Sequence, residues 1–384
     1  MAFVSSLCLQ SFRSYAQARL ADLASGLVVL YGQNGAGKTN VLEALSLLTP
    51  GRGLRGAKAM EIQCHQARDA WAVSATVQSV LTSVQLGTGL DPQTEKRQTR
   101  INGVPVKSQA ALADYVACVW LTPQMDRLFI DAAGERRRFL DRLVFTFDPG
   151  HSGRVTRYEN AMRQRSKLLQ EGRADTVWLD SLEAQMAQTG CAIAAARLEY
   201  VQRLQAAKDT PAAQHFPRAL LRARGTVEDL LSRATALEVE EMLAYQLKQS
   251  RERDAVSGGA ASGPHKSDLA VSYAAKNMPA DQCSTGEQKA LLIGIILAHA
   301  RLLAAERGAP PVLLLDEIAA HLDESRRAAL YEVLAALGGQ VWLTGTDESL
   351  FSAIRDTAQF FEVWQSAIYP ALPVRRLAQN ISAA

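Results

Sequence analysis

Apolar and polar residues follow different patterns in three successive parts of the chain. In the first part, up to about residue 119, apolar runs of strand length are separated by polar turns, and residues 71–77 alternate as a half-exposed antiparallel strand does. Asn102 and Gly103 lie between two short runs and form a favoured hairpin turn. We therefore expect a mixed sheet with strands at residues 4–9, 27–31, 71–77, 83–86, 99–106 and 116–121.

The second part, residues 149–256, has a helical pattern. Its large apolar residues recur near the 3.6-residue period of an α-helix: Trp178, Leu182, Met186, Ile193 and Leu204. A further helix is predicted from Thr226 to Ser250, because Thr226 and Asp229 have the spacing of a helix cap. We expect an inserted helical arm of about a hundred residues, with residues 257–264 as its flexible return linker.

The third part returns to alternating strands and helices. Strands are predicted at residues 269–273, 312–315 and 340–344, and helices at 287–307 and 323–337. Apolar runs without polar interruptions are typical of strands that helices cover on both faces. The predicted fold is therefore α/β, in which residues 1–148 and 257–384 share a mixed sheet with flanking helices and residues 149–256 form the inserted arm.

One short glycine-rich stretch has the composition and context of a phosphate-binding loop. It follows an apolar strand pattern, precedes a helical one, and consists of Gly32, Gln33, Asn34, Gly35, Ala36, Gly37, Lys38 and Thr39. Glycines let backbone N–H groups wrap a polyphosphate, and the following helix N-terminus adds positive charge. Lys38 is then placed to reach the β- and γ-phosphates of ATP, and the Thr39 hydroxyl to bind Mg²⁺. The alternative is a tight turn that merely contains lysine.

A pair of acids follows the apolar strand predicted at residues 312–315. A carboxylate at the end of such a strand can hold Mg²⁺ directly or through water, and Asp316 is the candidate for this role. Glu317 is the candidate base for the attacking water, which hydrolysis requires and phosphate transfer to a hydroxyl does not. The pair therefore favours an ATPase over a kinase, although it would also serve as a helix cap.

Charge, cysteines and histidines exclude several other classes of site. A net charge of +3 over 384 residues does not by itself imply a nucleic-acid partner. The five cysteines contain no CxxC pair and the six histidines lack ligand spacing, so we expect reduced core cysteines and no histidine metal site. The longest apolar stretch, residues 291–300, is roughly half the length of a membrane-spanning helix. We expect a cytoplasmic protein without a membrane segment.

Two motifs in the third part resemble those of ABC-type ATPases. Residues 284–288 resemble their signature motif, and residues 319–323 resemble the loop after their second acidic motif. A long helical insertion between phosphate loop and signature is a mark of the SMC and RecF group. Segments throughout the chain resemble the RecF family in particular, at residues 12–15, 37–44, 100–103, 121–126, 135–141 and 263–268. The resemblance implies an ABC-type ATPase head with a helical arm, and ATP and Mg²⁺ as cofactors.

The resemblance also implies roles for residues outside the phosphate loop. In this family the signature of one copy closes over ATP held by another, so Ser284 and Gly286 would contact the γ-phosphate in trans. Asp323 would lie at the dimer interface. Gln124 would contact Mg²⁺ or its water, at a position where the family has an acidic residue. Thr346 takes the place of a histidine found in many relatives, which implies slow hydrolysis.

Basic residues gather at the start of the predicted arm and on one loop of the first part. They are Arg154, Arg157, Arg163, Arg165, Lys167 and Arg173 on the arm, and Arg52 and Arg55 on the loop. Such residues can neutralise backbone phosphates without reading bases, although for any single arginine a solvated helix face is the simpler interpretation. No interleaving with aromatic residues suggests base stacking on single strands.

The resemblance implies an ATP-dependent clamp on duplex or gapped DNA. ATP would drive homodimerisation and hydrolysis would release it, while RecR, and RecO through it, would be partners in loading recombinase. The alternative is an SMC-like structural DNA scaffold with incidental ATP turnover, and a second is the ATP-binding subunit of a transporter. About 30 residues per arm helix give roughly 45 Å, too short for a long ring around DNA. The motif spacing disfavours the transporter.

Overall fold

A computed structural model describes residues 2–64, 67, 69–79, 82–172, 175–207 and 216–371. The chain divides into two compact units. The first contains Met1–Asp126, Asp209–Phe216 and Leu292–Ala384, and the second contains Arg127–Lys208 and Pro217–Leu291. Each unit has its own buried core among the described residues, and each is described by itself.

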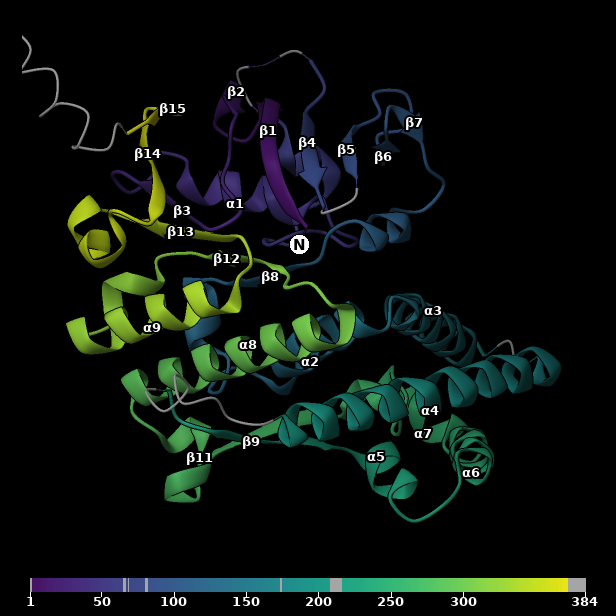
Figure 1. Ribbon diagram of the computed structural model, residues 1–384. Coiled ribbons are helices and arrows are strands. Elements are labelled where there is room, and N and C mark those ends of the chain that lie inside the picture. Colours follow the sequence, from purple (N-terminus) through teal and green to yellow (C-terminus); the bar gives the residue numbers. More distant parts are fainter. Residues whose placement is uncertain are drawn as a thin grey trace, which may run out of the picture. The chain divides into compact units, whose positions relative to one another are not determined.

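The first unit contains a mainly parallel sheet, which positions the candidate site. Its strand order is β15 (Ala367–Pro370), β14 (Ala358–Trp364), β3 (Leu27–Tyr31), β13 (Val341–Gly345), β12 (Val312–Leu315) and β8 (Cys118–Leu121) (Figure 1). Only β15 is antiparallel to its neighbour. The carboxyl ends of the other five strands therefore meet at one edge, where ligands of open α/β sheets bind.

A second sheet of the first unit is antiparallel throughout. It runs in the order β2 (Tyr15–Leu20), β1 (Phe3–Phe12), β4 (Ala72–Gln78), β5 (Ser83–Leu90), β6 (Arg97–Ile101) and β7 (Val104–Pro105). Asn102 and Gly103 have φ of 49° and 81° between β6 and β7, so the predicted hairpin is confirmed. Trp71, Phe12 and Trp342 are completely buried in one core cluster with residues of both sheets.

Helices cover the parallel sheet of the first unit. α1 (Lys38–Ser46) follows β3, and α9 (Glu324–Leu337) follows β12 and lies on the other side of the sheet in Figure 1. The remaining helical turns are η1 (Ala59–Ile62), η2 (Gln109–Asp114), η3 (Pro123–Arg127), η8 (Ile318–His321) and η9 (Glu348–Ile354). Of α8 (Thr285–Arg307), the residues from Leu292 onward belong to the first unit. α8 is the one described helix long and apolar enough to cross a membrane, yet 67% of its apolar window is buried, as in the core helix of a globular domain.

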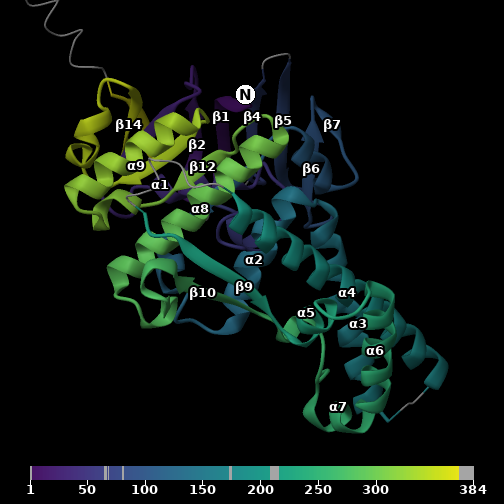
Figure 2. The ribbon, with the colours of Figure 1, turned by 60° about the horizontal axis from the view of Figure 1, so that its bottom comes forward.

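The second unit is mainly helical. Its helices are α2 (Ala133–Phe147), α3 (Gly150–Gln170), α4 (Thr176–Ala206), α5 (Thr226–Leu231), α6 (Ala236–Gln249) and α7 (Arg251–Ser257). Figure 2 shows α3, α4, α6 and α7 side by side, and Leu179, Met186 and Leu243 lie in their common core. A small antiparallel sheet joins β11 (Met278–Pro279), β10 (Asp268–Tyr273) and β9 (Ala219–Arg224), with short turns η5 (Pro264–Lys266), η6 (Ala274–Lys276) and η7 (Ala280–Gln282). Of the arm predicted at residues 149–256, the described residues lie within this unit except Phe216, which belongs to the first unit.

Two expectations for this region were wrong. The single helix predicted from Thr226 to Ser250 is two helices, and Thr226 is not its cap. Thr235 caps α6 instead, because its backbone N–H donates to Glu238 at 2.8 Å while its hydroxyl accepts from the Glu238 N–H at 3.4 Å. The strand predicted at residues 269–273 pairs with β9 and β11 and does not join the parallel sheet.

Candidate nucleotide-binding site

The glycine-rich loop connects β3 to α1 in the first unit, as its sequence predicts. Gly32, Gly35 and Gly37 have φ of 148°, 81° and 116°. A Cβ at Gly32 would lie 2.2 Å from the carbonyl oxygen of Val363, and one at Gly37 would lie 2.6 Å from the Tyr15 hydroxyl. Glycine is therefore required at both positions by backbone conformation and by space. Between them, Gln33, Asn34 and Gly35 are exposed, whereas Ala36 is buried.

Lys38 lies across this loop and is only 4% exposed. Its Nζ donates to the carbonyl oxygens of Gly32 at 2.7 Å and Gln33 at 2.9 Å. Burial lowers the pKa of Lys38, and the negative charges of Glu317 and Asp316 oppose that shift. The ammonium is thus held over the loop by neutral carbonyl groups. A polyphosphate in the loop would offer it a stronger, charged partner.

Thr39 and Asp316 meet at the shared edge of the parallel sheet. The Thr39 hydroxyl lies 3.0 Å from both carboxylate oxygens of Asp316, which is 6% exposed. A carboxylate and a hydroxyl are oxygen ligands of the kind Mg²⁺ prefers. The described residues contain no group of three or more His, Cys, Asp or Glu side chains able to hold a metal. A nucleotide and water would supply a cation here with further oxygen ligands.

Thr344, at the end of β13, is a site residue that sequence reasoning missed. Its hydroxyl donates to Asp316 Oδ1 at 2.7 Å and accepts from the backbone N–H of Glu317 at 2.9 Å. It therefore fixes the orientation of the candidate metal ligand and the path of the chain after it. The available signal was a hydroxyl inside an otherwise apolar, fully buried strand. Thr346, which takes the place of the family histidine, is exposed in the turn beyond β13.

Glu317 has a backbone conformation that is rare for its residue type. Its φ of 51° and ψ of 23° place it in the left-handed region. For a residue other than glycine such a conformation costs about 1–3 kcal/mol and is concentrated at functional sites. The structure brings Glu317 to the sheet edge beside Asp316, with its side chain partly exposed. This is the position that the sequence predicts for it.

Gln124 reaches the same edge from the neighbouring strand. β8 pairs with β12 so that Leu121 lies opposite Leu315, and Gln124 follows β8 in the turn η3. Its side chain is exposed. The structure gives no hydrogen bond between Gln124 and Thr39 or Asp316. Gln124 is thus near the edge without being tied to the site.

A buried carboxylate on α1 was also missed. Glu43 is 0% exposed and accepts from Arg13 Nε at 2.8 Å and from Arg55 Nη1 at 2.8 Å. Arg55 also donates to Asn40 at 2.7 Å, and Asn40 donates to Ser14 at 2.9 Å. These contacts tie two distant segments to the helix that begins in the phosphate loop. Glu43 is shared by two arginines and Arg55 remains exposed, so the predicted DNA contact of Arg55 stays a prediction.

The signature motif lies in the second unit at the start of α8. Ser284 donates its backbone N–H to Glu287 at 2.9 Å and accepts from the Glu287 N–H at 3.4 Å. The hydrogen bond from Lys276, followed by those from Ser284, lowers the pKa of Glu287 to about 2. Ser284 and Gly286 are exposed, and a Cβ at Gly286 would meet nothing within 4 Å. Nothing inside the described protein therefore explains why position 286 is glycine.

Asp323 lies in the first unit as the N-cap of α9. Its side chain accepts from the backbone N–H of Arg326 at 2.8 Å. The side chain remains 59% exposed. The carboxylate therefore has a local role in starting α9, and it is still accessible from outside.

The basic residues predicted to grip DNA have unequal positions in the arm. Arg165 is 1% exposed and bonded to Glu183 and Asp254 at 2.8 Å each, so the expectation that it contacts DNA was wrong. The sequence suggested an exposed Arg165, whereas the face of α3 that carries Arg165 packs against α4 and α7. Arg154 pairs with Asp148. The exposed basic residues are Arg157, Arg163 and Lys167 on the arm and Arg52 in the first unit. Arg173 lies outside the described residues.

Comparison with known proteins extends these observations. The family model described as RecF/RecN/SMC N terminal domain matches residues 3–367. Similar relatives include three proteins named DNA replication and repair protein RecF. That of Rhizobium rhizogenes is 48% identical over 369 residues and that of Agrobacterium fabrum 49% over 369, each covering 95% of this chain and 98% of the relative. That of Mesorhizobium japonicum is 48% identical over 370 residues, covering 96% and 97%.

Solved structures agree on the fold. The recombination mediator protein RecF-ATP of the RecFOR pathway matches with a TM-score of 0.81 and 21% identity, covering 96% of this chain and 99% of that chain. An Smc head domain from Pyrococcus furiosus matches with a TM-score of 0.55 and 14% identity, covering 100% and 99%. The mixed sheet with flanking helices is thus that of ABC-type ATPase heads. By sequence identity, extent of match and motif content, the chain belongs to the RecF family of DNA replication and repair proteins.

Proposed function

We propose that this protein is an ATP-dependent DNA clamp of recombinational repair. One observation carries the ATP-dependent part: the Thr39 hydroxyl at the end of the phosphate loop lies 3.0 Å from both carboxylate oxygens of Asp316. A hydroxyl on α1 and a carboxylate directly after β12 converge where a nucleotide-bound cation belongs. Membership of a DNA replication and repair family supports the DNA part.

The chain's own residues would bind and position the nucleotide. Backbone N–H groups from Gln33 to Thr39 wrap the phosphates, and Lys38 exchanges its carbonyl partners for the β- and γ-phosphates. Thr39 and Asp316 would hold Mg²⁺, with Gln124 reaching the ion or its water. Bound Mg²⁺ would neutralise phosphate charge as it builds up. Glu317 would orient the attacking water and accept its proton.

A second copy of the chain would complete the site. Ser284 and Gly286 are exposed at the start of α8, and the space around Gly286 is empty within this chain. An exposed helix start with free space suits an approaching γ-phosphate. In the proposed dimer these residues contact ATP bound to the other copy, and Asp323 lies at the interface. ATP therefore promotes dimerisation, and hydrolysis reverses it.

The proposed cellular role follows from this cycle. The dimer holds duplex or gapped DNA in the cytoplasm, near the nucleoid, and DNA stimulates a weak ATPase. RecR, and RecO through it, would be the partners that load recombinase at the gap. Residues 1–148 and 257–384 would form the ATPase domain, and residues 149–256 the arm. The longest arm helix, α4, has 31 residues and spans about 45 Å, too little for the ring of an SMC-like scaffold.

The rate of ATP hydrolysis per protomer, measured as protein concentration rises, tests the proposal. The assay is run with and without duplex DNA. A rate that increases with concentration and increases further with duplex supports a composite site assembled on DNA. A rate that is constant with concentration and unaffected by DNA means a self-contained site, and the clamp mechanism would be abandoned.

A further inference from the structure

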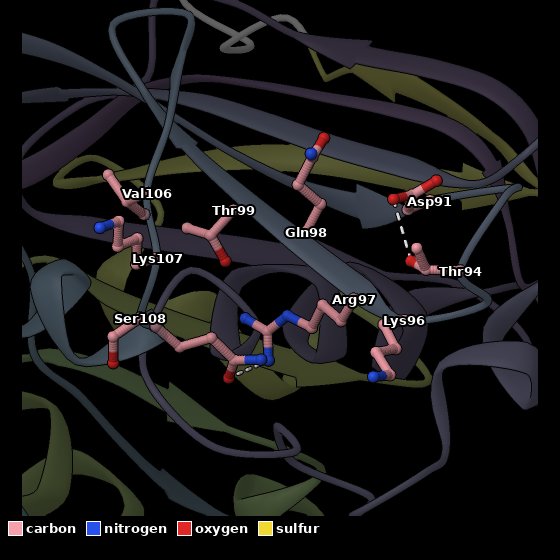
Figure 3. A pocket seen from close by; sticks show the side chains of 10 residues that line it. Asp91, Thr94, Lys96, Arg97, Gln98, Thr99, Val106, Lys107 and Ser108 are labelled. Carbon is pink, nitrogen blue, oxygen red and sulfur yellow. Dashed lines mark hydrogen bonds between the residues drawn. The ribbon is translucent and has the colours of Figure 1, made fainter.

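The first unit contains a second candidate site, a pocket of about 460 Å³ that the nucleotide site does not use. It is formed by the turn between β5 and β6, by β6 itself and by the segment after β7 (Figure 3). The side chains that matter for its chemistry are Thr94, Lys96, Arg97, Thr99, Lys107 and Ser108. No aromatic residue lines it. It therefore offers hydrogen-bond donors and positive charge, without a surface on which a base could stack.

Arg97 gives the pocket a positive charge that no acid in the described part of the chain neutralises. Its Nε donates to the Thr88 hydroxyl at 2.7 Å, and its other donors go to the carbonyl oxygens of Leu47, Thr49 and Gly51 and to Gln109. All these partners are neutral, and burial lowers the pKa of Arg97 to about 10, so the guanidinium remains charged at neutral pH. Its donors are occupied, so Arg97 acts as a positioning residue that supplies charge.

Lys96 and Lys107 are exposed at the pocket. Among the described residues, no carboxylate forms an ion pair with either lysine. The one acid of the lining, Asp91, already accepts from the backbone N–H of Gln93 at 2.9 Å and from the Thr94 hydroxyl at 2.9 Å. The described lining thus carries three positive groups and one carboxylate, whose oxygens are already engaged. The pocket has a net attraction for anions.

Thr99 provides an independent observation in favour of a ligand. It is 2% exposed, and its hydroxyl has no hydrogen-bond partner among the described residues. Figure 3 shows the hydroxyl pointing from β6 toward Arg97, on the pocket side of the strand. A buried hydroxyl without a partner is unfavourable in the free protein. An anion seated against this wall would accept from it.

A loop that carries another basic residue is hydrogen-bonded to the pocket wall. Gly51 accepts from Arg97 and donates its backbone N–H to Gln109 at 3.3 Å, so the pocket wall holds this loop in place. The next residue, Arg52, is exposed. A linear polyanion that reaches the pocket can therefore also meet Arg52. A chain of phosphates fits this arrangement better than a single small anion does.

We infer that this pocket binds a phosphodiester group of the backbone of duplex DNA. In this assignment Lys96 and Lys107 contact the phosphate, and the hydroxyls of Thr99 and Ser108 lie beside it. Arg97 ties the segments around the pocket together by hydrogen bonds and adds positive charge. The inference rests on the proposed clamp function and assigns a DNA contact within the first unit. Because Arg97 also binds carbonyls at the end of α1, the contact lies next to the helix that begins in the phosphate loop.

Binding of a fluorescent duplex to the full chain with ATP, measured over a range of salt concentrations, tests the inference. The Lys96→Ala, Lys107→Ala double variant should bind about tenfold more weakly. Its slope of log affinity against log salt should fall by about two contacts for each copy in the dimer, near 0.9 per contact. Arg19→Ala is the control for loss of surface charge, because Arg19 is exposed on β2 at the opposite edge of the same sheet. It should keep the slope of the unmodified protein.

Thr99→Val supplies a second measurement that does not depend on surface charge. Valine has the shape of threonine, so the free protein should melt at the same temperature or higher once the unpaired hydroxyl is gone. Its duplex affinity should nevertheless fall about threefold. A lower melting temperature together with unchanged DNA affinity would show that the hydroxyl is structural and would overturn the assignment.

The remaining outcomes separate this inference from the proposed function. If the unmodified protein binds no duplex with ATP, the clamp proposal and the pocket assignment both fail. If it binds duplex and the lysine variant binds equally well with the same salt slope, only the pocket assignment fails. A last outcome is that a polyglutamate peptide competes with duplex for the unmodified protein but not for the lysine variant, while both proteins bind duplex with the same affinity. That outcome would identify an acidic protein ligand and overturn the DNA assignment.

Discussion

The hydroxyl of Thr344 donates a hydrogen bond of 2.7 Å to Asp316 from the adjacent parallel strand. The same hydroxyl accepts the backbone N–H of Glu317 at 2.9 Å. One buried side chain thus orients the candidate metal ligand and holds the candidate base in its left-handed conformation. This contact therefore affects both the metal-binding role proposed for Asp316 and the base role proposed for Glu317, which are adjacent in the sequence.

Thr344→Val should weaken both stability and ATP turnover. Valine keeps the shape of threonine and leaves the Glu317 N–H and one Asp316 oxygen without this partner, which costs about 1–3 kcal/mol of unfolding free energy. Thermal melting and steady-state ATP hydrolysis are the measurements. Thr176→Val is the matched control, because Thr176 is exposed at the start of α4, in the other unit. Equal turnover by both variants would exclude an orienting role for Thr344.

Glu317→Gln should bind ATP normally and hydrolyse it at least a hundredfold more slowly, since a general base contributes about 10²–10⁴-fold. The dimer should consequently persist with ATP, as seen by size-exclusion chromatography with light scattering. Lys38→Ala is the contrasting variant, because it removes the ammonium that reaches the phosphates and should abolish nucleotide binding. Hydrolysis by Glu317→Gln at the unmodified rate would show that another group is the base.

Ser284→Arg should leave ATP binding to the single chain intact and prevent dimerisation. Ser284 is exposed, so the arginine is accommodated in the free chain, whereas in the proposed dimer it would collide with the partner's nucleotide. Nucleotide affinity by calorimetry and dimer formation with ATP are measured together. Gln282→Arg, at another exposed position of the same turn, should dimerise. Unchanged dimerisation of Ser284→Arg would remove the argument for a site shared between copies.

Arg165→Met should destabilise the second unit without acting through DNA charge. Removal of the guanidinium leaves Asp254 buried without its cation and Glu183 with Arg251 alone, which costs about 3–5 kcal/mol. Chemical denaturation measures the loss. Arg157→Ala, exposed on the same helix, should keep full stability. A small effect of Arg165→Met would mean that the buried carboxylates find other partners.

The pH dependence of stability that Glu287 causes should be confined to acid pH. Its folded-state pKa is lowered from 4.5 to about 2, first by Lys276 and then by Ser284. Its contribution is therefore fully present above pH 4.5 and is lost as the pH falls from about 4.5 to about 2. Glu287→Gln should flatten the melting temperature against pH in that window. Glu332→Gln, exposed on α9, should keep the unmodified profile, and an identical slope for both would refute the assignment.

The sequence was sufficient for features that depend on neighbouring residues. The glycines of the phosphate loop require positive φ or close backbone approach, and the strand before them and the helix after them are continuous in sequence. Asp316 and Glu317 were found for the same reason, because they directly follow an apolar strand. The hairpin at Asn102 and Gly103 depends only on turn chemistry. Family membership also followed from such short ordered motifs.

Tertiary structure decided everything that depends on which distant residues become neighbours. Thr344 contacts Asp316 only because β13 and β12 pair in one register. Glu43 accepts from both Arg13 and Arg55 only because two segments distant in sequence pack against α1. From the sequence Arg165 was expected to be a surface cation, but the packing of α3 against α4 and α7 buries it in ion pairs. Propensity and periodicity describe a chain's local preferences, whereas burial and charge pairing are set by packing between segments that the sequence holds apart.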